Sequence, residues 1–317
     1  MKNSIRVSIL VPIYNVEKFI GKCLDSIFSQ TYTNVNYVFA DDCSTDKSLK
    51  VLQSKLAEYS ISSERYTIIR HSENKGIAQT RIELLAEADG DYVQFIDSDD
   101  WIENNMIEAM VEATDNGNID IVGCDYNILY NNGSICNVNE DYSDNPYDNM
   151  LKCIDYNLAT TLWKLLIRKS LFKEFTIDKN VNIGEDYLIS IMLYYYANSF
   201  AAVKFPLYNY VHANNNRLSY KMKKSLSDHT TAVKKIERFF KDNGLLNEKI
   251  NNYLNLRKFN IKSNYLKKNT FDIIKYQSTF PEAEKTWRLI KYSRNEKIKF
   301  WLAEKKLYFI LKLIHKL

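Results

Sequence analysis

The sequence predicts an α/β protein with a Rossmann-like domain, whose mostly parallel sheet is flanked by helices, followed by a helical C-terminal region. Over the first 125 residues, short β-branched runs alternate with longer helical patterns. The 317 residues exceed the size at which a single hydrophobic core stops growing, about 250–300 residues. After Ser219 the pattern is helical to the end. We therefore expect two packed parts, residues 1–219 and residues 220–317.

Five short apolar runs in the N-terminal part are expected to be strands, and the segments between them to be helices. The strands are residues 7–11, 37–40, 67–70, 92–96 and 120–123. The helices are residues 16–29, 45–59, 77–88 and 103–116, which carry apolar residues three and four positions apart. In sheets of this kind, ligands bind beyond the carboxyl ends of the strands.

The rest of the N-terminal part is expected to contribute a loop and three helices. Residues 128–144 are polar and rich in asparagine, which favours a loop or hairpin over a site. Helical patterns follow at residues 147–157 and 162–172, and a third begins at Glu185. Residues 187–197 are apolar on nearly all sides, so we expect this third helix to be buried.

Composition and missing motifs exclude several classes of protein. Neither G-x-G-x-x-G nor G-x-x-x-x-G-K-[ST] occurs, which argues against dinucleotide oxidoreductases and P-loop enzymes. The five cysteines are odd in number and lack C-x-x-C spacing, so neither a disulfide framework nor a zinc site is indicated. This cysteine usage, with an apolar run at residues 7–11 too short for a signal peptide, predicts a cytoplasmic protein.

Two acidic pairs follow expected strands. Asp97 and Asp99 lie in F-I-D-S-D-D-W after the fourth strand, and Asp41-Asp42 closes the second. Side chains two apart on an extended backbone project to one side, and two such carboxylates repel each other unless a cation lies between them. Mg²⁺ or Mn²⁺ takes one or two protein carboxylates and fills its shell with water and substrate phosphates. This pattern predicts a diphosphate site; the alternative is a solvated turn that caps the next helix.

Five motifs in this order resemble the family 2 glycosyltransferases of bacterial polysaccharide synthesis, which have the GT-A fold. They lie between residues 7 and 219 and read V-S-I-L-V-P-I-Y-N-V-E-K-F-I, D-D-C-S-T-D-K-S, E-N-K-G-I-A-Q-T-R, G-D-Y-V-Q-F-I-D-S-D-D-W and N-I-G-E-D-Y-L. The resemblance implies inverting transfer of a hexose or N-acetylhexosamine from a UDP-sugar to a glycan acceptor, with Mn²⁺ or Mg²⁺ as cofactor, in capsule, exopolysaccharide or O-antigen assembly. Cys43, where a glycine is usual, and Ile82, where an asparagine is frequent, depart from the pattern and bear on donor selectivity.

Four residues are expected on the nucleotide side of the site, three of them from the resemblance and Lys75 from its charge. Pro12 and Tyr14 would line the base, and Asp42 would hydrogen-bond the uracil edge. A tyrosine ring offers a stacking face, and a carboxylate can accept the imide N–H of uracil, so the residue types suit these roles. Lys75 would contact phosphate. Ordinary packing after a strand is the alternative for Tyr14, and a solvated position is the alternative for Lys75.

The resemblance also implies a metal and donor-sugar side. Asp97, with Ser98 beside it, would lie near the ribose and the donor sugar, while Asp99 would hold the metal that bridges the diphosphate. His212 follows Y-N-Y-V and would ligate the metal or donate to the leaving phosphate. The alternative for His212 is a structural histidine.

Asp186 in I-G-E-D-Y matches the general base of the family. An inverting transfer needs such a base on the acceptor side to take the hydroxyl proton. Gly184 allows close approach of the backbone, and the helix N-terminus favours a charged carboxylate. The competing interpretation is that Glu185 and Asp186 only cap the helix.

The C-terminal segment is strongly basic. Residues 285–317 carry ten Lys and Arg against two Glu, which leaves 33 basic and 37 acidic residues before them. Residues 297–317 are expected to form one amphipathic helix. It could lie in a membrane interface beside a polyprenyl-diphosphate-linked acceptor, or pack on the domain or on a second subunit. The acidic body and the lack of a nucleic-acid-binding motif argue against nucleic acid as a partner.

Three rival functions are considered; the first stays open, and the sequence argues against the other two. A glycosyltransferase acting on a glycoprotein glycan would share the same donor site. A nucleotidyltransferase would need a Gly-rich basic loop, which V-P-I-Y-N-V-E-K lacks. A phospho-acceptor module would have its acidic pair after the first strand, where Pro12-Ile13-Tyr14 stand instead.

Overall fold

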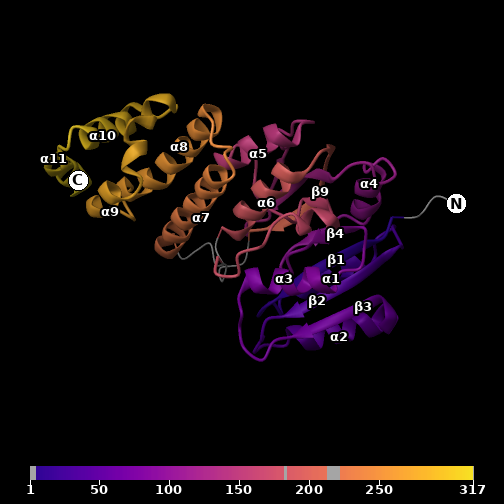
Figure 1. Ribbon diagram of the computed structural model, residues 1–317. Coiled ribbons are helices and arrows are strands. Elements are labelled where there is room, and N and C mark those ends of the chain that lie inside the picture. Colours follow the sequence, from indigo (N-terminus) through magenta and orange to yellow (C-terminus); the bar gives the residue numbers. More distant parts are fainter. Residues whose placement is uncertain (1–4, 182–183, 213–221, 317) are drawn as a thin grey trace. The chain divides into compact units, whose positions relative to one another are not determined.

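The computed structural model describes residues 5–181, 184–212 and 222–316 (Figure 1). Contacts along the chain divide it into two compact units. The sheet unit comprises residues 1–150 and 158–217, and the helical unit comprises residues 151–157 and 218–317. The domain boundary expected at residue 219 lies outside the described residues.

A nine-stranded sheet is the centre of the sheet unit, as far as the described residues show, with the order β3-β2-β1-β4-β8-β6-β9-β5 and with β7 paired to β6. Its strands are β1 Val7–Ile13, β2 Val35–Asp41, β3 Tyr66–Arg70, β4 Tyr92–Phe95, β5 Trp101–Ile102, β6 Ile121–Leu129, β7 Ile135–Val138, β8 Leu165–Arg168 and β9 Phe200–Val211. β1 to β4 pair in parallel, and β6 pairs in parallel with β9. The remaining pairs, which join β8 to β4 and β6, β7 to β6 and β5 to β9, are antiparallel.

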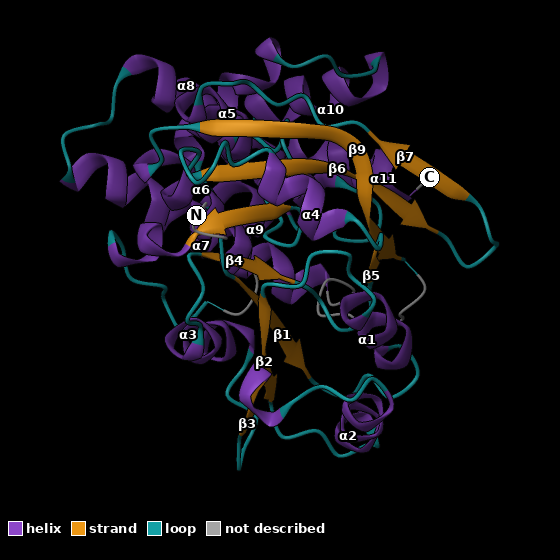
Figure 2. Cartoon of the chain, turned by 90° about the vertical axis from the view of Figure 1, so that its right-hand side faces the viewer, coloured by secondary structure: helices purple, strands orange, loops and turns teal. Residues whose placement is uncertain are grey.

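Helices cover both faces of the first four strands. The covering helices are α1 Ile20–Phe28, α2 Ser48–Glu58 and α3 Ile77–Glu87. Further along the chain come α4 Met106–Glu112, α5 Pro146–Ile154 and α6 Glu185–Tyr196. Figure 2 shows α3 on one face of these strands and α1 and α2 on the other. All seven residues of β1 are therefore buried, which explains its continuous apolar run. The expectation of an α/β fold with a mostly parallel sheet is confirmed.

The expected helix at residues 162–172 is wrong. Residues 165–168 form β8 between β4 and β6, and a 3₁₀ helix, Lys169–Lys173, follows it. A buried strand and one buried helical turn both appear as a short apolar run, so periodicity cannot separate them. The long strand β9 was also not expected. The loop expected at residues 128–144 contains the β6–β7 hairpin.

The helical unit contains the helices α7 Met222–Asp242, α8 Glu248–Ser263, α9 Ile273–Ser278, α10 Arg294–Glu304 and α11 Tyr308–Lys316 among its described residues. The 3₁₀ segments Asn264–Leu266 and Pro281–Leu289 join them. The single helix expected over residues 297–317 is wrong, because the chain turns between α10 and α11, where Lys306 has φ 57°. No described helix combines the length and apolar character needed to cross a bilayer.

Candidate active site

Parallel pairing brings the two acidic pairs to one edge of the sheet. Ile13 at the end of β1 is in register with Asp41 at the end of β2, and Leu10 is in register with Phe95 at the end of β4. Asp42 and Asp97 therefore follow the carboxyl ends of β2 and β4, the two strands that flank β1, as expected. This edge is where ligands bind in open α/β sheets.

Pro12 and Tyr14 lie at the end of β1 but differ in exposure. Pro12 is buried and in register with Ala40, whereas Tyr14 is 49% exposed just beyond the strand. Asn15, at φ 51°, turns the chain there, and its side-chain oxygen accepts a hydrogen bond from the Thr45 backbone N–H at 2.8 Å. The exposed ring of Tyr14 is available to stack on a planar ligand, and its role at the base stays a prediction.

Asp42 organises the loop before α3. Its Oδ1 atom accepts hydrogen bonds from the Lys75 backbone N–H at 2.7 Å, and its Oδ2 atom accepts one from the Gly76 backbone N–H at 2.9 Å. His71 Nδ1 lies 2.7 Å from the same Oδ1 atom. The Lys75 ammonium group pairs with Glu83 at 2.9 Å. Asp42 thus holds this loop in place, in addition to its predicted contact with uracil. The contact of Asp42 with uracil and that of Lys75 with phosphate remain predictions.

Three carboxylates gather after β4. Asp97 and Asp99 are partly exposed, whereas Ser98 and Asp100 are buried. Burial, together with the charges of Asp100, Asp99 and Asp97, raises the pKa of the Cys23 thiol well above its usual value. This shift reports a concentration of negative charge at the edge of the sheet.

Asp100 anchors the end of β9. Its Oδ2 atom accepts a hydrogen bond from the Tyr208 hydroxyl at 3.0 Å, and its Oδ1 atom accepts one from the Val211 backbone N–H at 2.8 Å. The Tyr208 hydroxyl also accepts a hydrogen bond from the Asp97 backbone N–H at 3.2 Å. These contacts tie the acidic turn to β9, on the opposite side of β4 from β1.

Arg81 of α3 joins the acidic turn to the start of α6. Its buried guanidinium lies 3.0 Å from Asp186 Oδ1 and 3.7 Å from Asp97 Oδ1, both measured from Nη2. Its Nε atom lies 3.8 Å from Glu185 Oε1. Burial lowers the pKa of Arg81, but the negative charges of these carboxylates have the larger effect, and the pKa is raised. A permanently charged guanidinium therefore sits among three carboxylates from two segments far apart in the sequence.

Sequence reasoning missed the role of Arg81, although α3 carried a signal for it. Ala78 and Leu84, three residues to either side of Arg81, are buried on the same face of the helix. A charge on the apolar face of an expected helix must be buried, and buried charges are paired. The sequence could have predicted a buried pair but not its partners.

The general base predicted from the sequence lies in this buried cluster. Asp186 and Glu185 open α6 after Gly184, whose φ of 86° is a backbone conformation suited to glycine. Burial raises the pKa values of both carboxyl groups, and Arg81 opposes the rise in each case. A carboxylate with a raised pKa accepts a proton more readily, once ionised, than an ordinary carboxylate does. The catalytic role of Asp186 stays a prediction.

The raised pKa of Glu185 predicts a pH dependence of stability. A folded-state pKa above the unfolded value means that the folded state binds the extra proton, so stability falls as pH rises above 4.5, the ordinary value. We expect wild type to lose stability relative to Glu185→Gln between about pH 5 and about pH 8, by at most about 1.4 kcal/mol per pH unit. Urea unfolding of both proteins at each pH measures this difference. If the free energies of unfolding of the two proteins changed in parallel with pH, the prediction would be wrong.

His212 directly follows Val211, the last residue of β9. Its ring centroid is 5.4 Å from that of Tyr130, and its backbone N–H donates to the Leu129 carbonyl at 2.8 Å. In the described part of the chain, no three His, Cys, Asp or Glu side chains form a ready-made metal site. Ligation of a metal by His212 stays a prediction.

The family follows from a comparison of sequences. The sequence model described as "Glycosyl transferase family 2" matches residues 8–182, more than half of the chain. The chain belongs to glycosyl transferase family 2. The resemblance based on the five motifs is confirmed, and the matched segment contains β2 to β4, all of β1 but its first residue, and the acidic turn.

Two relatives of this family 2 chain are bacterial. The chain is 31% identical to EpsH of Bacillus subtilis (strain 168) over 212 residues, which are 64% of this chain and 60% of EpsH. It is 32% identical over 218 residues to "Glycosyltransferase GlyA" of Streptococcus pneumoniae serotype 4, covering 65% of this chain and 30% of GlyA. The match thus spans less than two thirds of either relative.

Solved structures establish the fold of this family 2 chain. S. aureus TarS 1-349 in complex with UDP-GlcNAc superposes with a TM-score of 0.69 at 17% identity, covering 95% of this chain and 88% of that structure. Mannosyltransferase PcManGT from Pyrobaculum calidifontis, in complex with GDP-Man and Mn²⁺, has a TM-score of 0.56 at 17% identity, with 98% and 83% covered. The expected GT-A fold is confirmed.

Proposed function

We propose that this protein is an inverting glycosyltransferase that moves a hexose or N-acetylhexosamine from a UDP-sugar to a glycan acceptor. The observation that carries the proposal is the contact of one Arg81 nitrogen with both Asp97 and Asp186. The residue predicted for the donor sugar and the residue predicted as base therefore share one cation. Residues that act on the same reacting carbon must lie close together, and a shared cation is consistent with this requirement.

The proposed reaction is a single displacement. The acceptor hydroxyl oxygen forms a bond to the anomeric carbon while the bond from that carbon to the UDP oxygen breaks, with its electron pair leaving on UDP. Asp186 takes the hydroxyl proton. Attack opposite the leaving group inverts the anomeric configuration. A base so positioned contributes about 10²–10⁴-fold in rate.

The residues after β4 fit a divalent cation. Asp97 is 30% exposed, Asp99 is partly exposed, and both offer the hard oxygen ligands that Mg²⁺ and Mn²⁺ prefer. Such ions take one or two carboxylates and complete their shell with phosphate and water, so a cluster of three protein ligands is not required. Asp99 would hold the ion, with His212 as a further candidate. The ion would neutralise charge on the leaving diphosphate.

The UDP part of the donor is assigned to the edge formed by β1 and β2. The solved TarS complex with UDP-GlcNAc supports this choice of nucleotide and of an N-acetylhexosamine. Tyr14 would stack on the base beside Pro12, Asp42 would accept from uracil, and Lys75 would approach the phosphates once it leaves Glu83.

The acceptor and the site of action are proposed from relatives and from α11. The "Minor teichoic acid biosynthesis protein GgaB" of Bacillus subtilis, 27% identical over 207 residues, supports a bacterial surface glycan as acceptor. The side chains of Phe309 and Leu313, one helical turn apart, are exposed on α11 next to Lys312. Apolar and basic residues so arranged suit the inner membrane surface, where a polyprenyl-diphosphate-linked acceptor would be located.

Calorimetric titration with UDP tests the donor site. We expect UDP to bind in the presence of Mn²⁺ and expect EDTA to weaken its affinity by about tenfold or more, which corresponds to about 1.4 kcal/mol. A titration with Mn²⁺ alone serves as the control. UDP affinity that is the same with and without EDTA would remove the metal from the proposal, and absence of UDP binding in both conditions would overturn the donor assignment.

A further inference from the structure

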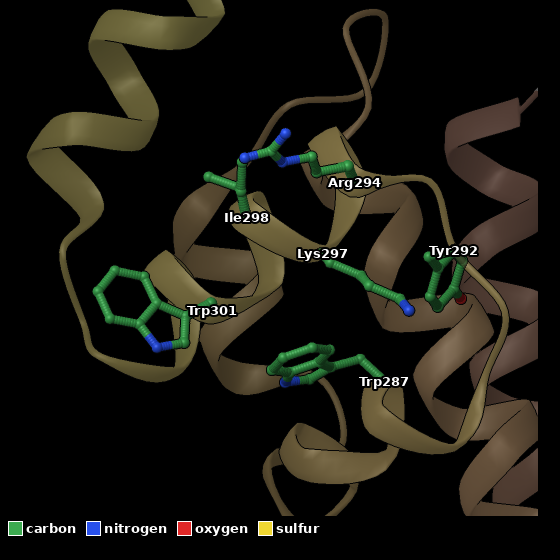
Figure 3. Close-up of a pocket in the computed structure, with 6 residues that line it drawn as sticks. All are labelled: Trp287, Tyr292, Arg294, Lys297, Ile298 and Trp301. Carbon is green, nitrogen blue, oxygen red and sulfur yellow. The ribbon is translucent and has the colours of Figure 1, made fainter.

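The helical unit contains an open aromatic pocket that the proposed transfer reaction does not use. Its volume is about 530 Å³, within the range of small-molecule sites. Six side chains line it, and all come from residues 287–301: Trp287, Tyr292, Arg294, Lys297, Ile298 and Trp301. Figure 3 shows them around one space, with Lys297 extending toward the side where Trp287 and Tyr292 lie.

One face of α10 supplies most of this lining. Arg294, Lys297, Ile298 and Trp301 stand at positions i, i+3, i+4 and i+7, which share a face of a helix. The other side of α10 buries Phe300 and Ala303. Trp301 is 46% exposed. A face that combines two apolar side chains with two cations is therefore turned to the pocket instead of to the core.

The two rings at the base of the pocket are held in place. Trp287 Nε1 donates a hydrogen bond to Glu304 at 3.1 Å, and the Tyr292 hydroxyl donates one to Asn260 at 3.1 Å. Glu304 also accepts a hydrogen bond from Arg288 at 2.7 Å. With their polar atoms bound inward, the Trp287 and Tyr292 rings present apolar surface to the space. A preorganised aromatic surface binds a rigid ligand at low entropic cost.

The charge of the pocket is positive. Arg294 and Lys297 are exposed, and neither pairs with an acidic group among the residues described in the structure. The nearby carboxylate of Glu304 is already engaged by Trp287 and Arg288, and that of Glu296 by the cap of α10. An anionic group on a bound ligand would supply the missing partner.

We propose that this pocket binds an anionic glycan, namely sugar rings that carry carboxylate or phosphate groups. The C–H face of a pyranose ring is apolar and packs on an indole, while Lys297 and Arg294 would pair with the acidic substituent. The two indole rings and the two cations around this open pocket favour a ligand with rings and acidic groups over a lipid surface, which is contacted by protruding apolar side chains such as that of Phe309 on α11. That the glycan is the acceptor chain rests on the proposed function; the binding itself does not.

The test is calorimetric titration of the full chain with tetragalacturonate, and with the neutral cellotetraose as a matched ligand. We expect tetragalacturonate to bind more tightly than cellotetraose and with an affinity that falls as salt is added. Trp301→Ala and Lys297→Glu should each weaken it by about tenfold, as truncation of an aromatic or charged anchor does. Phe309→Ala and Lys312→Glu on α11 are the matched controls, and they should bind as wild type does.

Two outcomes would overturn the inference. The first is that wild type binds neither saccharide. The second is that Trp301→Ala and Lys297→Glu bind tetragalacturonate normally but lose binding to phosphatidylglycerol vesicles, which would make the pocket part of a membrane surface. A parallel UDP titration separates this failure from failure of the proposed function, because the pocket variants leave the residues of the sheet unit unchanged.

Discussion

Replacing Asp186 with asparagine is expected to lower kcat by about 10²–10⁴-fold and to leave UDP affinity nearly unchanged. Asparagine keeps the size of the side chain but cannot take the acceptor proton. Asp186 lies beside the buried Arg81, with its own side chain 24% exposed, and is assigned as the base of the proposed displacement. Steady-state kinetics with a UDP-sugar and its acceptor, together with calorimetry with UDP, measure the two effects separately.

Asp99→Asn is the contrasting variant for Asp186→Asn. Asp99 lies in the acidic turn and is assigned to the metal, so this variant should lose both turnover and metal-dependent UDP binding. Equal loss of UDP affinity in the two variants would show that the roles of base and metal ligand are wrongly divided. Full activity of Asp186→Asn would exclude this residue as the base.

Arg81→Met is expected to lower the free energy of unfolding by about 3–5 kcal/mol, because removing one partner of a buried ion cluster leaves charge uncompensated. The guanidinium is the shared cation of Asp97, Glu185 and Asp186. Its removal should also raise the pKa of Asp186, since Arg81 holds that pKa down. The pH profile of kcat should therefore move to higher pH. Urea unfolding and pH-dependent kinetics measure the two effects.

Lys164→Met is the matched control for a buried cation. Lys164 is fully buried and pairs with Glu140, outside the acidic turn. Lys164→Met should destabilise the protein to a similar degree while leaving the pH profile of kcat unchanged. Arg81→Lys, which keeps the charge, should restore part of the stability. If Arg81→Met and Lys164→Met shift the pH profile equally, Arg81 has only a structural role.

Local patterns in the sequence were sufficient to predict the parallel half of the sheet and the edge at which the acidic residues lie. Alternation of apolar runs and helical segments depends on neighbours a few residues apart, and β1 to β4 follow from it. Because parallel strands all end on the same side, the placement of Asp42 and Asp97 at one edge also followed. The family could be identified from the same segment.

Only the tertiary structure decided which residues meet across long separations in the chain. The short run that forms β8 is a strand because β4 and β6 offer it backbone hydrogen bonds on both sides. The partners of Arg81 come from a turn and a helix that no local pattern connects to α3. The break between α10 and α11, and the pocket lined by Trp287 and Trp301, depend on how one segment packs on another. Periodicity indicates which face of an element is apolar, but the free energy of packing and charge pairing determines which residues that face contacts.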